Sequence, residues 1–397
     1  MKHIFLSILI IGCQLLQAQT IHQKFNTDFQ KFLNDSGFKH ATIGLFVSDM
    51  NTGKTVTSFN QQVGLAPAST QKIITAATAY QLLGKDFRYE TTIGYRGEIE
   101  GGRLKGDIVI KGSGDPTLGS WRYDSTREQN VINEIVAAIL QFGIKEIEGH
   151  VLVDESMFDD EAIPDGWIWQ DIGNYYGAGA RALNWRENQF DLYLRSGIQV
   201  SSDVEITGTQ PALISGLNLI SKVKSAAAGT GDNAYIYLPL FGGSGYVRGT
   251  IPVNQKVFTI SGALPNPGKQ LALTLESVLK KMPFKETEKA YPQSESLNLS
   301  DVHHIYTLQS PSMDSICYWF LQKSINLYGE ALLKTLGKRY GKGGSTTEGI
   351  KVIQDFWKKQ GIDNDALKMI DGSGLSPQNR ITVDDLVKVL MFARNQP

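Results

Sequence analysis

The stretch LAPASTQKIITAATAYQLLG, residues 65–84, carries a single charged residue, Lys72, three positions after Ser69. Pro67 comes just before a run of apolar residues at helical spacing, and Gly84 follows as a stop signal, so the stretch predicts a helix. Because apolar residues cover nearly every side of it, this helix should be buried in a core. The lysine in it therefore requires an explanation.

A serine and a lysine three positions apart on a helix share one face, with their Cβ atoms about 5 to 6 Å apart. Burial disfavours the ammonium form and lowers the pKa of a lysine, so Lys72 can become a base for the proton of Ser69. This predicts a serine nucleophile with a lysine general base. Burial singles out this pair, because the same spacing recurs in polar surroundings at Ser36/Lys39, Ser221/Lys224 and Ser277/Lys280.

The bulk composition is that of a folded protein with two or three domains: 397 residues, 41% hydrophobic, with 40 glycines and 13 prolines. The chain has 39 basic and 40 acidic residues. Such a balance creates no net field to attract nucleic acid or an anionic membrane. We therefore expect neither as a partner.

Residues 1–18 have the pattern of a signal peptide, with Lys2 and His3 ahead of a short apolar run and small residues up to Ala18 for cleavage. The run is too short to span a membrane, and no later run of 18 apolar residues occurs, so no transmembrane segment is expected. The mature protein should work in the periplasm. Alternatively, Cys13 is a lipoprotein cysteine that anchors the chain at a membrane surface.

Cys317 is the single cysteine left after signal removal, which excludes an internal disulfide. We interpret it as a buried helical core residue, with a catalytic cysteine as the alternative. The histidines lack metal-ligand spacing such as His-Glu-x-x-His. Neither a metal nor another cofactor is expected.

The rest of the chain divides by its patterns into helical and β-rich parts. We predict a helix near 25–33, a hairpin in 40–60, strands from 88 to about 285 interrupted by a helix near 130–144, and helical structure again from about 302. The helices expected there are 312–337, ended by Gly337, then 345–360 and one from 383. The predicted domains are a catalytic domain of 19–87 with 300–397 and a β-rich insertion of 88–299, in one or two subdomains.

A second signal is the triplet Ser324-Ile325-Asn326. A buried Ser-x-x-Lys followed by Ser-x-Asn on or beside a helix is the order found in penicilloyl-serine enzymes. In those enzymes the second serine relays a proton, and the asparagine orients the lysine and the substrate amide. Ser324 and Asn326 are the candidates for these roles.

These motifs resemble the D-alanyl-D-alanine carboxypeptidase/endopeptidase family of class C low-molecular-mass penicillin-binding proteins, from about residue 25 to the end. Five segments in family order carry the resemblance: PASTQK (67–72), KGSGDPTL (111–118), DGWIWQDIGNYYGAGARALNWREN (165–188), SINLYGEALL (324–333) and DGSGLS (371–376). The resemblance implies an α/β (α+β) transpeptidase-like domain, with helices packed on an antiparallel sheet and a large insertion between the first two motifs. It also implies a secreted serine DD-peptidase that acts on peptidoglycan stem peptides and is inhibited by β-lactams.

Two features depart from the family pattern. No Lys-Thr/Ser-Gly triplet follows Asn326, so we expect that C-terminal strands with this third motif are missing from the sequence. The family also implies an aspartate and an arginine that hold the zwitterionic end of the stem-peptide side chain. Asp171 matches the aspartate, whereas Pro377 follows DGSGLS and Arg380 is the nearest guanidinium.

Two alternatives remain open at this point. The first is a β-lactamase or esterase with the same nucleophile and base. The second is a noncatalytic or truncated homologue that binds the cell wall, which the absent third motif favours. Reading the gene beyond codon 397 for that motif would separate the second alternative from the peptidase.

Overall fold

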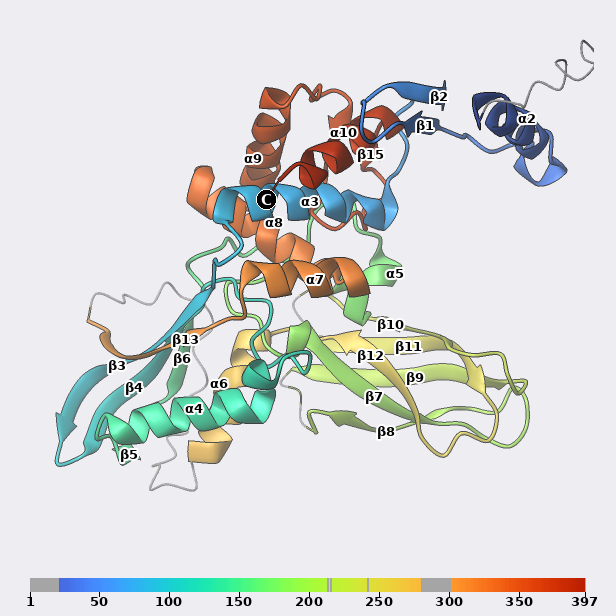
Figure 1. Cartoon of the computed structure of the whole chain (residues 1–397). Coiled ribbons are helices and arrows are strands. Elements are labelled where there is room, and N and C mark those ends of the chain that lie inside the picture. Colours follow the sequence, from blue (N-terminus) through green and yellow to red (C-terminus); the bar gives the residue numbers. More distant parts are fainter. Residues whose placement is uncertain (1–20, 213, 215, 241–242, 280–300, 397) are drawn as a thin grey trace, which may run out of the picture. The chain divides into compact units, whose positions relative to one another are not determined.

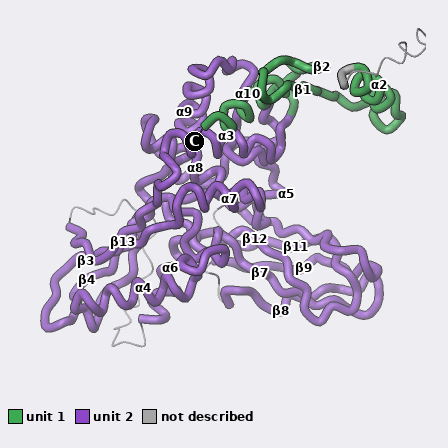
Figure 2. The backbone as a smooth tube through the Cα atoms, viewed as in Figure 1, with its two compact units in different colours: residues 1–65, 381–397 green, residues 66–380 purple. Residues whose placement is uncertain are grey.

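The computed structural model describes residues 21–212, 214, 216–240, 243–279 and 301–396. Two compact units are present, Met1–Leu65 with Ile381–Pro397, and Ala66–Arg380 (Figure 2). The predicted signal peptide lies outside the described residues. The predicted domains have other boundaries than these units, and they stay a prediction.

The smaller unit contains the amphipathic helix and the hairpin expected near its start. Helix α2 (Ile21–Leu33) presents phenylalanine rings that stack on one another. Strands β1 (Leu45–Ser48) and β2 (Thr55–Phe59) pair in antiparallel register, and the Asp49 carboxylate accepts two backbone N–H groups of the turn between them. Helix α10 (Val383–Arg394) packs against β1.

The larger unit has a group of packed helices: α3 (Lys72–Leu83), α7 (Met313–Lys323), α8 (Asn326–Tyr340) and α9 (Thr346–Lys359) (Figure 1). Helix α8 is buried from Asn326 to Gly337. The prediction of one helix over 312–337 is wrong at two places. The chain breaks at Ser324, which is in the left-handed conformation and ends α7, and α8 continues past Gly337.

A five-stranded sheet contains β3 (Glu90–Glu100), β4 (Arg103–Lys111), β5 (Glu146–Ile147), β6 (Val151–Asp154) and β13 (His303–Gln309). Helices α4 (Glu128–Gln141) and α6 (Pro267–Leu279) share one hydrophobic core with it. The helix expected near 130–144 is confirmed as α4. The expectation of strands up to about 285 and of helical structure from about 302 is wrong at two segments, because α6 is helical and β13 is a strand paired with β3.

Two further sheets enclose a second core. One has the order β12–β7–β8 (Phe258–Ala263, Gln189–Arg195, Glu205–Gln210), and the other β10–β11–β9 (Asn233–Tyr237, Gly243–Pro252, Leu217–Ala226). Their inward-facing apolar residues alternate with outward-facing polar ones, as in β7, where every second residue is buried. The β-rich nature of this part of the chain is thereby confirmed.

The remaining elements are short. They are the 3-10 turns η1 (Ser36–Phe38), η2 (Ala68–Gln71), η3 (Asp124–Thr126), η4 (Tyr175–Gly177) and η5 (Arg186–Asn188), the helix α5 (Trp169–Ile172), and the strands β14 (Leu367–Lys368) and β15 (Arg380–Ile381). Of these, η2, α5 and η4 carry residues of the candidate site.

Candidate active site

Ser69 lies in η2, the single turn that leads into α3, and its side chain is exposed. Ala68 just before it has a φ of 47°, in the left-handed region that costs a residue with a side chain about 1–2 kcal/mol. The serine therefore lies at the exposed start of a buried helix. Its hydroxyl is open to a substrate.

Lys72 is the first residue of α3, and its side chain is 1% exposed. The Nζ atom lies 3.2 Å from Ser69 Oγ, 2.6 Å from Asn326 Oδ1 and 2.7 Å from the carbonyl oxygen of Ser373. The amine thus contacts groups from η2, α8 and the 371–376 loop. Ser69, Lys72 and Asn326, predicted from separate motifs, meet at this point.

The protonation of Lys72 follows from this burial. Desolvation lowers its pKa from 10.5 to about 8, although the carboxyl groups of Glu330 and Asp371 act in the opposite direction. About a tenth of the amine is therefore neutral at pH 7, far more than for an exposed lysine. The sequence argument predicted this direction from burial alone.

Asn326 fixes the orientation of the neutral amine. Its Nδ2 donates to the carbonyl oxygen of Tyr176 at 2.7 Å, so its Oδ1 is the atom that faces Lys72. Asn326 Oδ1 and the Ser373 carbonyl can only accept hydrogen bonds. A neutral amine has two N–H groups, which these acceptors use, and its lone pair is left to face Ser69.

The 371–376 loop is held by Asp371, which is fully buried. Its two oxygens accept hydrogen bonds from five N–H donors: Gln71 Nε2, Trp167 Nε1, Gly374 N, Ser376 N and Asn379 Nδ2. All five partners are donors, which suits an ionised carboxylate. The loop is thereby tied to Gln71, the residue next to Lys72, and it presents the Ser373 carbonyl to the amine.

Ser324 ends α7 with φ 55° and ψ 44°, and its side chain is exposed. Among the described residues, its hydroxyl makes no hydrogen bond to Ser69, Lys72 or Asn326. The turn at Ser324 starts α8 at Asn326. Ser324 therefore defines where the asparagine helix begins, and its hydroxyl is open to a substrate.

Asp171 lies in α5, and its carboxyl group hydrogen-bonds with the Tyr176 side chain. Partial burial raises the pKa of Asp171. The carbonyl of the same Tyr176 accepts a hydrogen bond from Asn326, so Tyr176 links Asp171 to the asparagine that contacts Lys72. Arg380, in contrast, donates to the carbonyls of Pro377 and Asn379 in its own segment.

The chain matches the D-Ala-D-Ala carboxypeptidase 3 (S13) family over residues 25–397. It belongs to this family. It is 25% identical over 383 residues to the D-alanyl-D-alanine carboxypeptidase of Actinomadura sp. (strain R39), covering 93% of this chain and 68% of that protein. It is also 25% identical over 360 residues to the D-alanyl-D-alanine carboxypeptidase DacB of Haemophilus influenzae, covering 90% of this chain and 72% of that protein.

A crystal structure of penicillin binding protein 4 (dacB) from Haemophilus influenzae has the same fold, with a TM-score of 0.71 and 22% sequence identity over 88% of this chain and 75% of that one. This likeness confirms the predicted α/β, transpeptidase-like fold class. As a member of the S13 family, the chain is a hydrolase of the D-Ala-D-Ala carboxypeptidase class. Within its described part, no helix is both long and apolar enough to cross a membrane.

Sequence reasoning missed three contributors to the candidate site: the carbonyls of Ser373 and Tyr176 and the side chain of Glu330. The Ser373 carbonyl is a backbone atom, so no residue type could reveal it. Glu330, which is fully buried on α8, did leave a signal, because it is a lone acid within the apolar run SINLYGEALL. Cys317, by contrast, is buried in α7, and burial raises its pKa to about 12, which favours the core interpretation over a catalytic thiol.

Proposed function

We propose that this S13 protein is a serine DD-peptidase that uses Ser69 as nucleophile and Lys72 as general base on peptidoglycan stem peptides. The observation that supports this most directly is the amine of Lys72, buried between two carbonyl acceptors with its third direction toward Ser69. A base held in this way needs no rearrangement to take the serine proton. The names of the family and of the relatives supply the substrate class.

The proposed reaction has two stages. Ser69 Oγ attacks the carbonyl carbon between the two terminal D-alanines, and its proton passes to Lys72 Nζ. The C–N bond then breaks, and the Ser324 hydroxyl relays a proton to the departing D-alanine amine, which leaves an ester on Ser69. Water hydrolyses this ester, the serine regains a proton, and Asn326 holds both Lys72 and the substrate amide throughout.

Three finer properties belong to the same proposal. Endopeptidase activity is the same chemistry with the amine of a cross-link as leaving group, and penicillin acylates Ser69 through its strained amide. Asp171 binds the far end of the stem-peptide side chain. The signal-like residues 1–18 direct export to the periplasm, which fractionation of cells expressing the full gene tests directly.

A labelled penicillin tests the nucleophile. The wild-type protein should be labelled, and Ser69→Ala should lose labelling by a factor on the order of 10³ or more, because no other group replaces the nucleophile. The matched control is Ser36→Ala, an exposed serine with the same spacing to a lysine, which should label like the wild type. Equal labelling of Ser69→Ala and wild type would remove Ser69 from the mechanism.

The turnover of the adduct separates the peptidase from a β-lactamase. A DD-peptidase keeps the penicilloyl group for many minutes and releases D-alanine from a peptide ending in D-Ala-D-Ala. Rapid loss of the adduct without release of D-alanine would assign β-lactamase activity. Both measurements can be made on one preparation.

A further inference from the structure

Glu330 lies on α8, one helical turn after Asn326, and is fully buried. Its two carboxyl oxygens accept the backbone N–H of Gly372 at 3.1 and 3.0 Å. Gly372 directly precedes Ser373, whose carbonyl oxygen accepts from Lys72. The carboxyl group thus holds the part of the loop that supplies one of the two acceptors of the amine.

The close packing around Gly372 makes this arrangement rigid. A Cβ atom on Gly372 would lie 2.5 Å from the carbonyl oxygen of Gly329, the residue before Glu330. On its other side, the Thr75 hydroxyl of α3 donates to the Gly372 carbonyl oxygen at 2.7 Å. Gly372 is therefore held between α3 and α8, next to the residue that contacts Lys72.

Glu330 is also an ionisable group with no solvent-exposed surface. The charged groups that face it are Asp371 on the loop and Lys72 on α3. Burial, followed by the charge of Asp371, raises the pKa of Glu330 to about 8, whereas Lys72 acts to lower it. Of the charged groups near Lys72, Glu330 does most to raise its pKa, which opposes the effect of desolvation. The two groups act on each other and titrate in the same pH range, so the pKa of each depends on the charge of the other.

We propose that Glu330 is a positioning residue for the peptidase reaction, whose charge sets the pH at which Lys72 becomes a base and whose carboxyl group holds the Ser373 carbonyl in place. The inference rests on the proposed function of Lys72 as the base. While Glu330 is ionised, it stabilises the ammonium form of Lys72, so a higher pH is needed before Lys72 can act as a base. While Glu330 is protonated, the neutral amine is favoured.

The direct test is an NMR titration of protein labelled with ¹³C at the Cε atom of its lysines. The signal of Lys72 is the one that disappears in Lys72→Met. In the wild type, Lys72 should titrate in two overlapping steps. In Glu330→Gln it should titrate in one step, with a midpoint about one pH unit lower, because the neutral amide keeps the shape and removes the charge. An unchanged midpoint and curve in Glu330→Gln would overturn the proposal.

Thr75→Val is the matched control. It removes an uncharged contact to the same Gly372, so the Lys72 midpoint should stay where it is in the wild type. A shift in Thr75→Val equal to that in Glu330→Gln would show a mechanical effect and contradict the role of charge.

Two further measurements complete the design. If Glu330→Gln does not fold, the reciprocal experiment uses ¹³C in glutamate Cδ: the midpoint of Glu330 should rise in Lys72→Met, and no rise would overturn the coupling. The rate of acylation by penicillin should fall on the acidic side of its pH profile, and the midpoint of this fall should shift together with the titration midpoint of Lys72. A shifted Lys72 titration in a protein that penicillin never acylates would support the coupling and contradict the proposed function, so the two failures are distinguishable.

Discussion

Gly374 shows how tightly the nucleophile region is packed. It has a φ of 83°, and a Cβ atom there would lie 1.9 Å from the carbonyl oxygen of Ala68, the residue before Ser69. We predict that Gly374→Ala destabilises the fold by clearly more than the roughly 1–2 kcal/mol of left-handed strain, because backbone must also move. Chemical denaturation measures the free energy of unfolding.

Gly361 provides the comparison for this substitution. Its φ is also 83°, but a Cβ atom there has nothing within 4 Å. Gly361→Ala should therefore cost the strain alone. If the two substitutions cost the same, the contact between Gly374 and Ala68 contributes nothing measurable.

At the level of single residues, the sequence predicted the groups whose chemistry is unusual for their surroundings. Lys72 stood out as a lone charge in an apolar run, and Ser69 and Asn326 followed from motif order. The groups that accept hydrogen bonds from Lys72 and Asn326 include backbone carbonyls, which have no sequence signature. The Ser373 and Tyr176 carbonyls are backbone atoms, which every residue has, so only the fold can select them.

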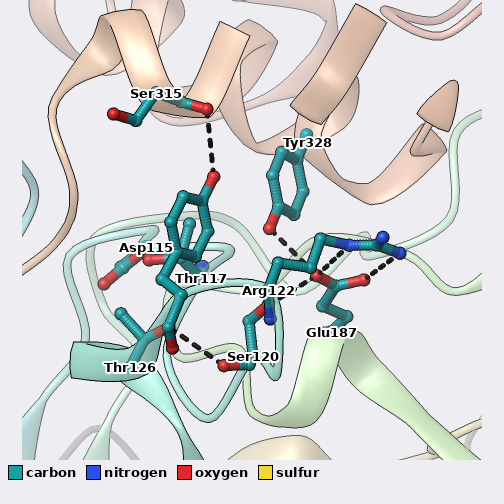
Figure 3. Close-up of polar contacts among 9 residues, drawn as sticks. Asp115, Thr117, Ser120, Arg122, Thr126, Glu187, Ser315 and Tyr328 are labelled. Carbon is teal, nitrogen blue, oxygen red and sulfur yellow. Dashed lines mark hydrogen bonds and ion pairs between the residues drawn. The ribbon is translucent and has the colours of Figure 1, made fainter. Parts of the chain in front are cut away.

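Helix α8 is positioned by a buried carboxylate as well as by apolar contacts. Figure 3 shows Tyr328 of α8 and Arg122 directed at the carboxylate of Glu187, which is 0% exposed. Tyr328 Oη donates to it at 3.0 Å, Ser120 Oγ at 2.7 Å and Arg122 Nε at 2.8 Å. Tyr328 is two residues from Asn326, so this cluster ties the start of α8 to the segments around Ser120 and Glu187.

We predict that Tyr328→Phe destabilises the protein by about 1–3 kcal/mol, because a buried carboxylate loses a donor that water does not replace. Tyr340→Phe on the same helix is the control. Its ring is half exposed and its hydroxyl donates to the Leu82 carbonyl, so the loss should be roughly 0.5 kcal/mol. Equal losses, measured by thermal unfolding, would mean that the Glu187 cluster gives no special support.

Two elements escaped prediction for identifiable reasons. The break between α7 and α8 depends on a left-handed Ser324, a conformation that usually involves glycine or asparagine, so the sequence carries no stop signal there. The helix α6 has leucines at every second position, Leu271, Leu273 and Leu275, and this alternation is typical of a strand, so the sequence there is ambiguous. Strongly patterned elements such as α2, α4 and the β1–β2 hairpin were predictable.

For the molecule as a whole, Lys72 and Glu330 shape the pH dependence of stability in opposite ways. Between pH 4.5 and about 8, the folded state keeps a proton on Glu330 that the unfolded state has lost, so the stability falls as the pH rises. Between about 8 and 10.5, the unfolded state keeps a proton on Lys72 that the folded state has lost, so the stability rises with pH. These two groups together predict a stability minimum near pH 8.

Thermal unfolding of variants from pH 5 to 10 measures each contribution. Relative to the wild type, Glu330→Gln should remove a decline on the order of a few kcal/mol below pH 8, and Lys72→Met should remove the rise above it. Other buried acids, such as Asp115, also titrate, but they are common to all three proteins and cancel in the differences. Parallel curves for the wild type and Glu330→Gln would contradict a raised pKa of Glu330.

The hydrogen bonds of Lys72 span sequence separations of 254 and 301 residues, to Asn326 and Ser373. A growing polypeptide that ends before residue 326 therefore has neither carbonyl acceptor for this amine, whatever its helices have already formed. Long-range contacts of this kind also form late in folding, because a large loop must close first. During synthesis the amine of Lys72 therefore lacks both acceptors, and the arrangement around it can be completed only after residue 373 has been added to the chain.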